Sequence, residues 1–183
     1  MPCELIIGGA RSGKSRHAEQ RAAASGLPVR VIVTAEALDE EMSARIARHQ
    51  ADRPAGWGVV EAPRGLAAAL AAEAAEGRCV VVDCLTLWLA NLLDGADALS
   101  PGGGGELLPA LARERAALLA LIPRLPGEVI FVANEVGFGL VPETALGRLF
   151  RDEAGRLNQA VAALCERVTL VAAGLPLTLK GRG

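Results

Sequence analysis

The chain has 183 residues, enough for one compact domain with a buried core and too few for two complete ones, so we expect a single domain over residues 1–183. Its 19 Lys and Arg residues and 21 Asp and Glu residues leave a formal net charge of −2, which argues against nucleic acid or an anionic membrane surface as the main partner. The four cysteines suggest neither a zinc site nor a disulfide framework, and a reducing cytoplasm fits them. The most apolar segment, CVVVDCLTLWLANLL, is interrupted by Asp83 and is too short to span a membrane.

Short runs of β-branched residues predict strands, in chain order ELIIG, VRVIVT, WGVVEA, CVVVD, EVIFVAN and RVTLVAAG. Helical spacing predicts helices between them, from Lys14 to about Ala24 and over residues 64–76 and 106–122. The runs lack apolar/polar alternation, which is typical of strands covered on both faces. The sequence therefore predicts an α/β fold with a mostly parallel central sheet and helices on both faces.

Two segments near the C-terminal half are predicted to lie outside the main pattern. Residues 94–106, DGADALSPGGGGE, combine proline with four consecutive glycines, so we expect neither a helix nor a stable strand but a surface loop, with an interdomain linker as the alternative. The final GLPLTLKGRG is expected to form a last edge strand followed by a frayed tail.

The stretch IIGGARSGKS carries the spacing GxxxxGK followed by Ser, formed by Gly8, Gly13, Lys14 and Ser15. Such a turn lets backbone N–H groups face a polyphosphate, while Lys14 supplies a cation and the Ser15 hydroxyl can bind the nucleotide's magnesium. A chance glycine-rich turn is the alternative, but the strand before and the helix after it favour a phosphate loop. We therefore expect a P-loop NTPase.

A phosphate loop alone does not distinguish kinases, ATPases and GTP-driven switches. Asp83 ends the buried strand CVVVD, where a second magnesium-directed carboxylate is expected, although capping of the next helix would also explain it. The segment FVANEVG offers Asn134 and Glu135 but no NKxD motif for guanine, which counts against a Ras-type switch. Residues 134–143, NEVGFGLVPE, either line the active cleft or form an ordinary strand-to-helix turn.

His49 is a candidate covalent nucleophile because a neutral imidazole can attack phosphorus and carry a nucleotidyl group. Arg45 lies one helical turn before it and Arg53 one turn after, where their guanidinium groups would favour a phosphate, and Pro54 ends any helix beyond Arg53. The alternative is a partly buried histidine at a helix end beside solvated arginines. His17, the other histidine, is expected either to be structural or to support residues that touch the ligand.

Four blocks of the sequence, taken in order, resemble the bifunctional adenosylcobinamide kinase/adenosylcobinamide-phosphate guanylyltransferase family of cobalamin biosynthesis: GGARSGKSRHAE, DEEMSARIARHQADRP, ANEVGFGLVPE and FRDEAGRLNQ. The resemblance implies a RecA-like P-loop fold, commonly a homotrimer. It also implies two reactions. A nucleoside triphosphate phosphorylates adenosylcobinamide, and GTP then guanylylates a histidine that passes GMP to adenosylcobinamide phosphate.

By resemblance, the GMP-accepting histidine falls on His49. Lys14 is expected to act in the kinase step, where its charge would help to stabilise the transferring phosphoryl group. The implied magnesium ligands are Ser15 and Asp83, with GTP or ATP as substrates. Nucleotide binding is implied for Gly8, Gly9, Ala10, Arg11, Ser12, Gly13, Lys14, Ser15, Val33, Thr34, Ala35, Gln50, Ala51, Asp52, Arg53, Glu61 and Asp83. The sequence VTA at residues 33–35 departs from the family's usual ATA or ATS. Two alternatives stay open: a small-molecule kinase without a histidine adduct, and a nucleotide-responsive binding module.

Overall fold

The computed structural model describes residues 3–36, 40, 54, 56–93 and 104–181. The strands are β1 (Cys3–Gly8), β2 (Val29–Val33), β3 (Gly58–Glu61), β4 (Cys79–Asp83), β5 (Glu128–Asn134), β6 (Arg167–Ala172) and β7 (Leu175–Lys180). The helices are α1 (Lys14–Ala24), α3 (Leu66–Glu73), α4 (Leu85–Leu93), α5 (Gly104–Leu121), the short 3₁₀ helix η1 (Ile122–Arg124) and α6 (Ala145–Leu164).

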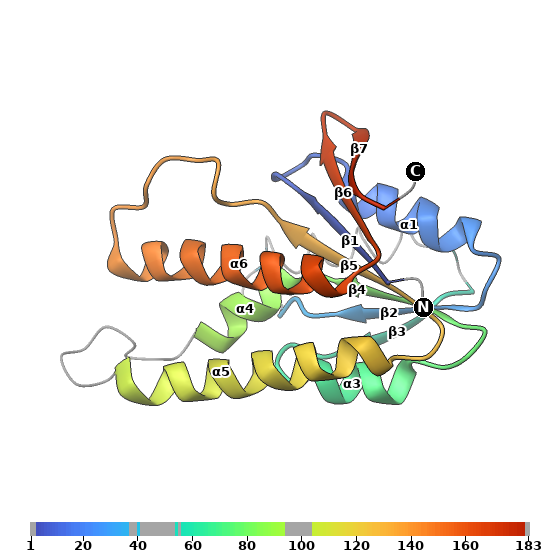
Figure 1. The fold of residues 1–183 in the computed structure, drawn as a ribbon, viewed down its shortest axis with the longest axis horizontal. Coiled ribbons are helices and arrows are strands. Elements are labelled where there is room, and N and C mark those ends of the chain that lie inside the picture. The colour runs from blue at the N-terminus through green and yellow to red at the C-terminus, as the bar shows by residue number, and fades with distance from the viewer. Residues whose placement is uncertain (1–2, 37–39, 41–53, 55, 94–103, 182–183) are drawn as a thin grey trace.

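The strands form one seven-stranded sheet in the order β3-β2-β4-β5-β1-β6-β7 (Figure 1). All neighbouring strands are parallel except β7, which pairs antiparallel with β6 at the edge. The expected α/β fold with a mostly parallel sheet is confirmed, and so is the last edge strand. Because β5 lies between β4 and β1, the strand that ends at Asp83 is not a direct neighbour of the strand that enters the phosphate loop.

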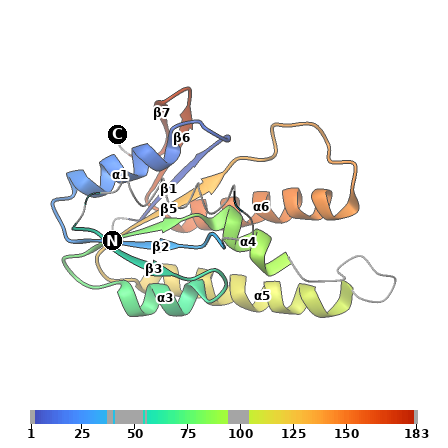
Figure 2. The same cartoon turned by 180° about the vertical axis from the view of Figure 1, so that it is seen from behind.

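The two faces of the sheet bury different helices, as the opposite views in Figures 1 and 2 show. Leu5, Val80 and Phe131 point to the face covered by α3, α4, α5 and α6, where Trp88 is fully buried. Ile6 and Val81 point to the opposite face, where Ala18 and Ala22 of α1 pack closely. Helices on both faces explain why the central strands read as unbroken apolar runs in the sequence.

The expected helix from Lys14 to Ala24 is confirmed. Helix α3 lies within the expected helical segment 64–76, and α5 overlaps the expected segment 106–122. The expectation of no helix in residues 94–106 is wrong at its end, because α5 already begins at Gly104. Gly104 and Gly105 stand in the first turn of α5, so the cost of about 1 kcal/mol that glycine carries in a helix interior does not apply to them in full. Residues 94–103 lie outside the described part of the chain.

No helix among the described residues is long and apolar enough to cross a membrane.

Candidate active site

The carboxyl ends of five parallel strands bring the predicted site residues to one edge of the sheet. Gly8 ends β1 and pairs with Asn134 at the end of β5. Asp83 ends β4 and pairs with Val33 of β2, which in turn pairs with Glu61 of β3. Ligands of open α/β sheets bind outside this edge. The structure therefore gathers here residues that are widely separated in the sequence.

Two glycines of the phosphate loop are required by close contacts and backbone conformation. A Cβ on Gly8 would lie 2.4 Å from the carbonyl oxygen of Val171 and 2.5 Å from Oγ of Ser12. Gly13 has a φ of 95°, a left-handed conformation that side chains rarely adopt, and it approaches Gly174 closely. The GxxxxG spacing thus reflects a tight turn packed against the β6–β7 hairpin.

Lys14 begins α1 and folds back over the loop. Its side chain is buried, and Nζ donates a hydrogen bond to the carbonyl oxygen of Gly9 at 3.1 Å. The N-cap residue Gly13 has no side chain to bond the amides of the first turn, and that turn contains no acidic residue. Backbone N–H groups, the helix dipole and the ammonium group together make this loop suitable for an anionic phosphate chain.

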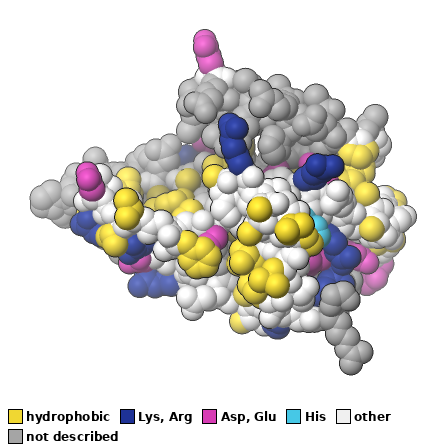
Figure 3. All heavy atoms as spheres, turned by 90° about the horizontal axis from the view of Figure 1, so that it is seen from above, with side chains coloured by type: hydrophobic (Ala, Val, Ile, Leu, Met, Phe, Trp, Pro, Cys, Tyr) yellow, Lys and Arg dark blue, Asp and Glu magenta, His cyan; other side chains and the backbone are white. Residues whose placement is uncertain are grey.

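The turn between β6 and β7 supports the loop from the side. Gly174 N donates to the carbonyl oxygen of Ser12 at 2.8 Å, and Ala173 and Gly174 both have positive φ values, as a tight two-residue hairpin requires. Beyond the turn, β7 exposes Leu175, Leu177 and Leu179. Figure 3 views the face that carries α1 and β7, where hydrophobic side chains lie exposed beside Lys and Arg side chains.

Ser15 and Asp83, the predicted magnesium ligands, lie together at a small cavity of about 10 Å³. Its lining consists of Ser15, Ala18, Glu19, Val31, Trp57, Val81, Asp83 and Val132. Mg²⁺ usually takes only one or two protein oxygens and fills its remaining positions with water and phosphate oxygens. A hydroxyl and a carboxylate beside a phosphate loop fit that preference, while the described residues contain no cluster of three or more His, Cys, Asp or Glu side chains for a metal.

Thr34 is fully buried, and its side chain braces the ends of β2 and β4. Oγ1 donates to the carbonyl oxygen of Cys84 at 2.7 Å and accepts from Cys84 N at 2.9 Å, while Thr34 N donates to the carbonyl oxygen of Asp83 at 3.0 Å. Asn91 Nδ2 donates to the Thr34 carbonyl oxygen at 2.6 Å. These contacts position Asp83, so the structure gives Thr34 a supporting position beneath the edge.

The other predicted residues on β2 and β3 differ in exposure. Val33 is buried in the core below the edge, Ala35 is half-buried and Glu61 is exposed. His49 and the residues from Gln50 to Arg53 lie outside the described part of the chain. The role of His49 as the GMP acceptor and the role of residues 50–53 in nucleotide binding therefore stay predictions.

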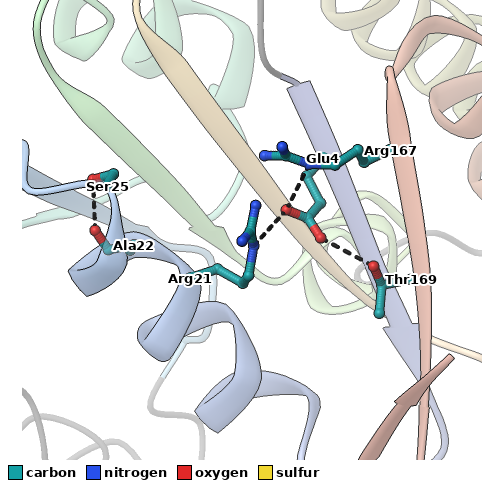
Figure 4. Close-up of polar contacts among 6 residues, drawn as sticks. All are labelled: Glu4, Arg21, Ala22, Ser25, Arg167 and Thr169. Carbon is teal, nitrogen blue, oxygen red and sulfur yellow. Dashed lines mark hydrogen bonds and ion pairs between the residues drawn. The ribbon is translucent and has the colours of Figure 1, made fainter. Parts of the chain in front are cut away.

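A buried carboxylate attaches α1 to the sheet below the loop (Figure 4). Glu4 on β1 is 3% exposed, and its Oε2 accepts from Nε of Arg21 on α1 at 3.1 Å and pairs with Nε of Arg167 on β6 at 3.3 Å. Its Oε1 accepts from Oγ1 of Thr169 at 3.0 Å. A buried charge with several partners of this kind fixes relative positions, because removing any partner leaves the carboxylate poorly satisfied.

His17 lies one turn before Arg21 on α1, near this cluster. Burial lowers the pKa of His17, with the Glu4 carboxylate opposing that effect and Arg21 adding to it. The neutral form is therefore favoured, which agrees with the structural role expected from the sequence.

The sequence predicted that residues 134–143 either line the active cleft or form an ordinary turn, but it gave Asn134 no separate role and did not single out Thr86. Asn134 N donates to Oγ1 of Thr86 at 2.7 Å, and Asn158 Nδ2 donates to the Asn134 carbonyl oxygen at 3.2 Å. An asparagine at the end of an apolar strand is the only local signal in the sequence. Its importance depends on β5 pairing with β1, which the local pattern does not reveal.

The loop that follows β5 is exposed and apolar. Phe138 is 85% exposed, Leu140 96% and Val141 65%. Hydrogen bonds order the loop at both ends: Gly137 N donates to Oε1 of Glu135, and Nη1 of Arg148 donates to the carbonyl oxygens of residues 142 and 143 at 3.0 and 2.7 Å. Large apolar side chains displayed on an ordered loop are typical of a binding surface.

Comparison with known proteins extends over nearly the whole chain. The family model described as cobinamide kinase / cobinamide phosphate guanyltransferase matches residues 4–179. The bifunctional adenosylcobalamin biosynthesis protein CobP of Pseudomonas aeruginosa is 54% identical over 178 residues, 97% of each chain. The proteins named bifunctional adenosylcobalamin biosynthesis protein CobU from Salmonella typhimurium and Escherichia coli are 43% and 41% identical, over 96% of this chain and 98% of theirs.

Proposed function

We propose that one phosphate loop serves both activities of this chain, which belongs to the cobinamide kinase / cobinamide phosphate guanyltransferase family. As a kinase, it phosphorylates the aminopropanol hydroxyl of adenosylcobinamide with ATP or GTP. As a guanylyltransferase, it moves GMP from GTP through His49 to adenosylcobinamide phosphate, giving adenosylcobinamide-GDP. The observation that carries the proposal is the convergence of the phosphate loop and Asp83 at one edge of the sheet.

In the kinase step the protein mainly positions and neutralises charge. Backbone amides from Gly8 to Ser15 bind the phosphates, and Lys14 exchanges its bond to the Gly9 carbonyl for phosphate oxygens. Bound Mg²⁺, held by Ser15 and Asp83, would neutralise charge that builds up on the phosphate oxygens. The corrinoid is a large substrate, and among the described residues Phe138, Leu140 and Val141 offer it an exposed apolar surface. The apolar loop with Phe138 and Leu140 is the surface we assign to it.

In the guanylyl step, a ring nitrogen of His49 attacks the α-phosphorus of GTP. The bond from that phosphorus to the bridging oxygen breaks, pyrophosphate leaves, and a phosphoramidate forms. A phosphate oxygen of adenosylcobinamide phosphate then attacks the same phosphorus and releases the imidazole. Arg53, one turn after His49, is proposed to bind the phosphate oxygens. The sequence pattern and the family resemblance support these assignments.

We further propose a cytoplasmic homotrimer. The four cysteines are free thiols, which suits a reducing compartment. The trimer is inferred from the family resemblance, and equilibrium sedimentation of the purified protein tests it.

Labelling with GTP that carries a radioactive α-phosphate tests the proposed function. After incubation with magnesium and denaturation, the wild type should retain label in an acid-labile, base-stable form. His49→Ala should lose the label, whereas His17→Ala, the matched histidine control, should keep it. Absence of label with intact corrinoid phosphorylation would leave the simple kinase, and absence of both activities would leave the binding module.

A further inference from the structure

Asn134 stands between the two halves of the phosphate site. It ends β5, the strand that lies between β1 with its phosphate loop and β4 with Asp83. Side chains alternate along strands, and Val132 faces α1, so Asn134 two residues later faces the same side. Val81 faces α1 as well, which places Asp83 on that side too. The carboxamide therefore lies on the same face of the sheet as Asp83 and next to Gly8.

Three separate elements fix the backbone at this position. Asn134 N donates to Thr86 of α4, and its carbonyl oxygen accepts from Asn158 of α6. The next amide, Glu135 N, donates to the carbonyl oxygen of Gly8 at 3.0 Å. The direction in which the carboxamide leaves the strand is thus set by the fold.

The carboxamide oxygen of Asn134 is buried and accepts no hydrogen bond from the described residues. Ser12 Oγ, beside Gly8, is likewise buried and has no hydrogen-bond partner among the described residues. The third buried side-chain atom without a hydrogen bond in the described part of the chain, Arg167 Nε, still pairs with Glu4 at 3.3 Å. Unsatisfied buried acceptors are rare, and a functional site is one of the few places where a ligand can supply the missing donor.

We propose that Asn134 is a catalytic residue of the kinase reaction, whose carboxamide oxygen accepts a hydrogen bond from the hydroxyl of adenosylcobinamide. This inference rests on the proposed use of the phosphate loop as the triphosphate site. The hydrogen bond turns a lone pair of the hydroxyl oxygen toward the γ-phosphorus. A neutral carboxamide suits this place because, unlike a carboxylate, it does not repel the triphosphate.

The step balances without any further reagent. A bond forms between the hydroxyl oxygen and the γ-phosphorus, and the bond from that phosphorus to the β–γ bridging oxygen breaks. Its electron pair leaves with the nucleoside diphosphate. Because a carboxamide does not take up a proton, the hydroxyl proton passes to solvent water. Guanylylation uses an imidazole nitrogen as nucleophile and no hydroxyl, so it should not depend on Asn134.

The test compares Asn134→Ala with Asn134→Asp and with Asn158→Ala. The last is the matched control, since it removes the support of the Asn134 carbonyl but leaves the carboxamide. The measurements are kcat and KM of corrinoid phosphorylation, the amount of enzyme labelled by GTP carrying a radioactive α-phosphate, and the thermal unfolding midpoint.

Asn134→Ala should lower kcat of the kinase reaction roughly 10- to 100-fold with little change in nucleotide KM or in labelling. Asn134→Asp keeps an acceptor oxygen and should recover part of that kcat, with a higher nucleotide KM. Asn158→Ala should keep kcat while unfolding at a lower temperature.

An unchanged kinase kcat in Asn134→Ala would overturn the inference. So would an equal loss of labelling, which would indicate a contact with the nucleotide or its magnesium, or the same selective loss in Asn158→Ala, which would indicate structural support only. Failure of the proposed guanylyl transfer would be seen separately, as missing label in the wild type with normal phosphorylation.

Discussion

Replacing Gly8 with alanine should distort the phosphate loop through its contact with the neighbouring strand. The new Cβ would lie 2.4 Å from the carbonyl oxygen of Val171, and real Cβ atoms essentially never approach closer than 3.0 Å, so these two atoms must move apart by at least 0.6 Å through a shift of the backbone. Val171 pairs with Gly8 inside the sheet, which means that the obstacle is backbone and not the end of a flexible side chain.

The structure allows the size of this effect to be worked out. Overpacking of a well-packed interior costs about 1–3 kcal/mol, and a backbone obstacle argues for the upper end, about 3 kcal/mol. With about 2.1 cal/mol/K of unfolding entropy per residue, a chain of 183 residues loses roughly 0.4 kcal/mol of stability per kelvin near its midpoint. The expected fall in Tm is therefore about 8 °C.

Calorimetry of Gly8→Ala beside Gly9→Ala tests this reasoning. A Cβ on Gly9 would meet nothing within 4 Å, so this neighbouring substitution should change Tm by no more than about 1 °C. Because the loop is displaced by a fraction of an ångström, the Gly8→Ala enzyme should also phosphorylate adenosylcobinamide more slowly than the wild type, by up to about 100-fold. Equal Tm values for the two variants would refute the argument, because the only structural difference invoked is the contact with Val171 and Ser12.

Three further outcomes are expected. Replacing both Phe138 and Leu140 with alanine should raise KM for adenosylcobinamide about 10- to 100-fold, because the ligand would cover both exposed side chains. Tm should stay unchanged. A normal KM would place the corrinoid elsewhere. Burial lowers the pKa of His17 below its unfolded-state pKa of 6.5, so the contribution of His17 to stability is complete above pH 6.5 and declines as the pH falls below that value. Between pH 7.5 and 5.5, Tm should therefore drop more in the wild type than in His17→Gln. Parallel curves of Tm against pH for the two proteins would contradict this. All four cysteines are buried, and burial raises the pKa of Cys79 to about 11. A thiol reagent at pH 8 should therefore modify the native protein far more slowly than the unfolded protein. Stopped-flow absorbance would measure the two rates.

The sequence predicted those features that local residues determine. The β-branched runs became strands, and the central ones are buried on both faces, whereas the edge strand β3 is only partly covered. The glycine spacing identified the phosphate loop because a Cβ on Gly8 would strike the backbone of Val171 and Gly13 has a φ of 95°. The same local reasoning missed the helical start at Gly104, because glycine in the first turn of a helix does not carry its full interior cost. It also could not distinguish Thr34, which braces the edge from below, from residues that face a ligand. That distinction depends on contacts with β4, far away in the sequence.

The strand order suggests how the two proposed nucleophiles would reach one triphosphate. His49 belongs to the connection between β2 and β3, and both of these strands lie beyond β4 from the phosphate loop, on the Asp83 side. The exposed loop with Phe138 instead leaves β5, directly beside β1. Backbone amides bind phosphates without regard to which phosphorus will react, so we propose that the side from which the nucleophile arrives selects the reaction. Substitutions in the loop after β5 should therefore affect phosphorylation of the corrinoid while sparing enzyme guanylylation, and substitutions at His49 should do the opposite. A variant of either group that abolished both reactions while binding GTP normally would mean that the two nucleophiles share one approach.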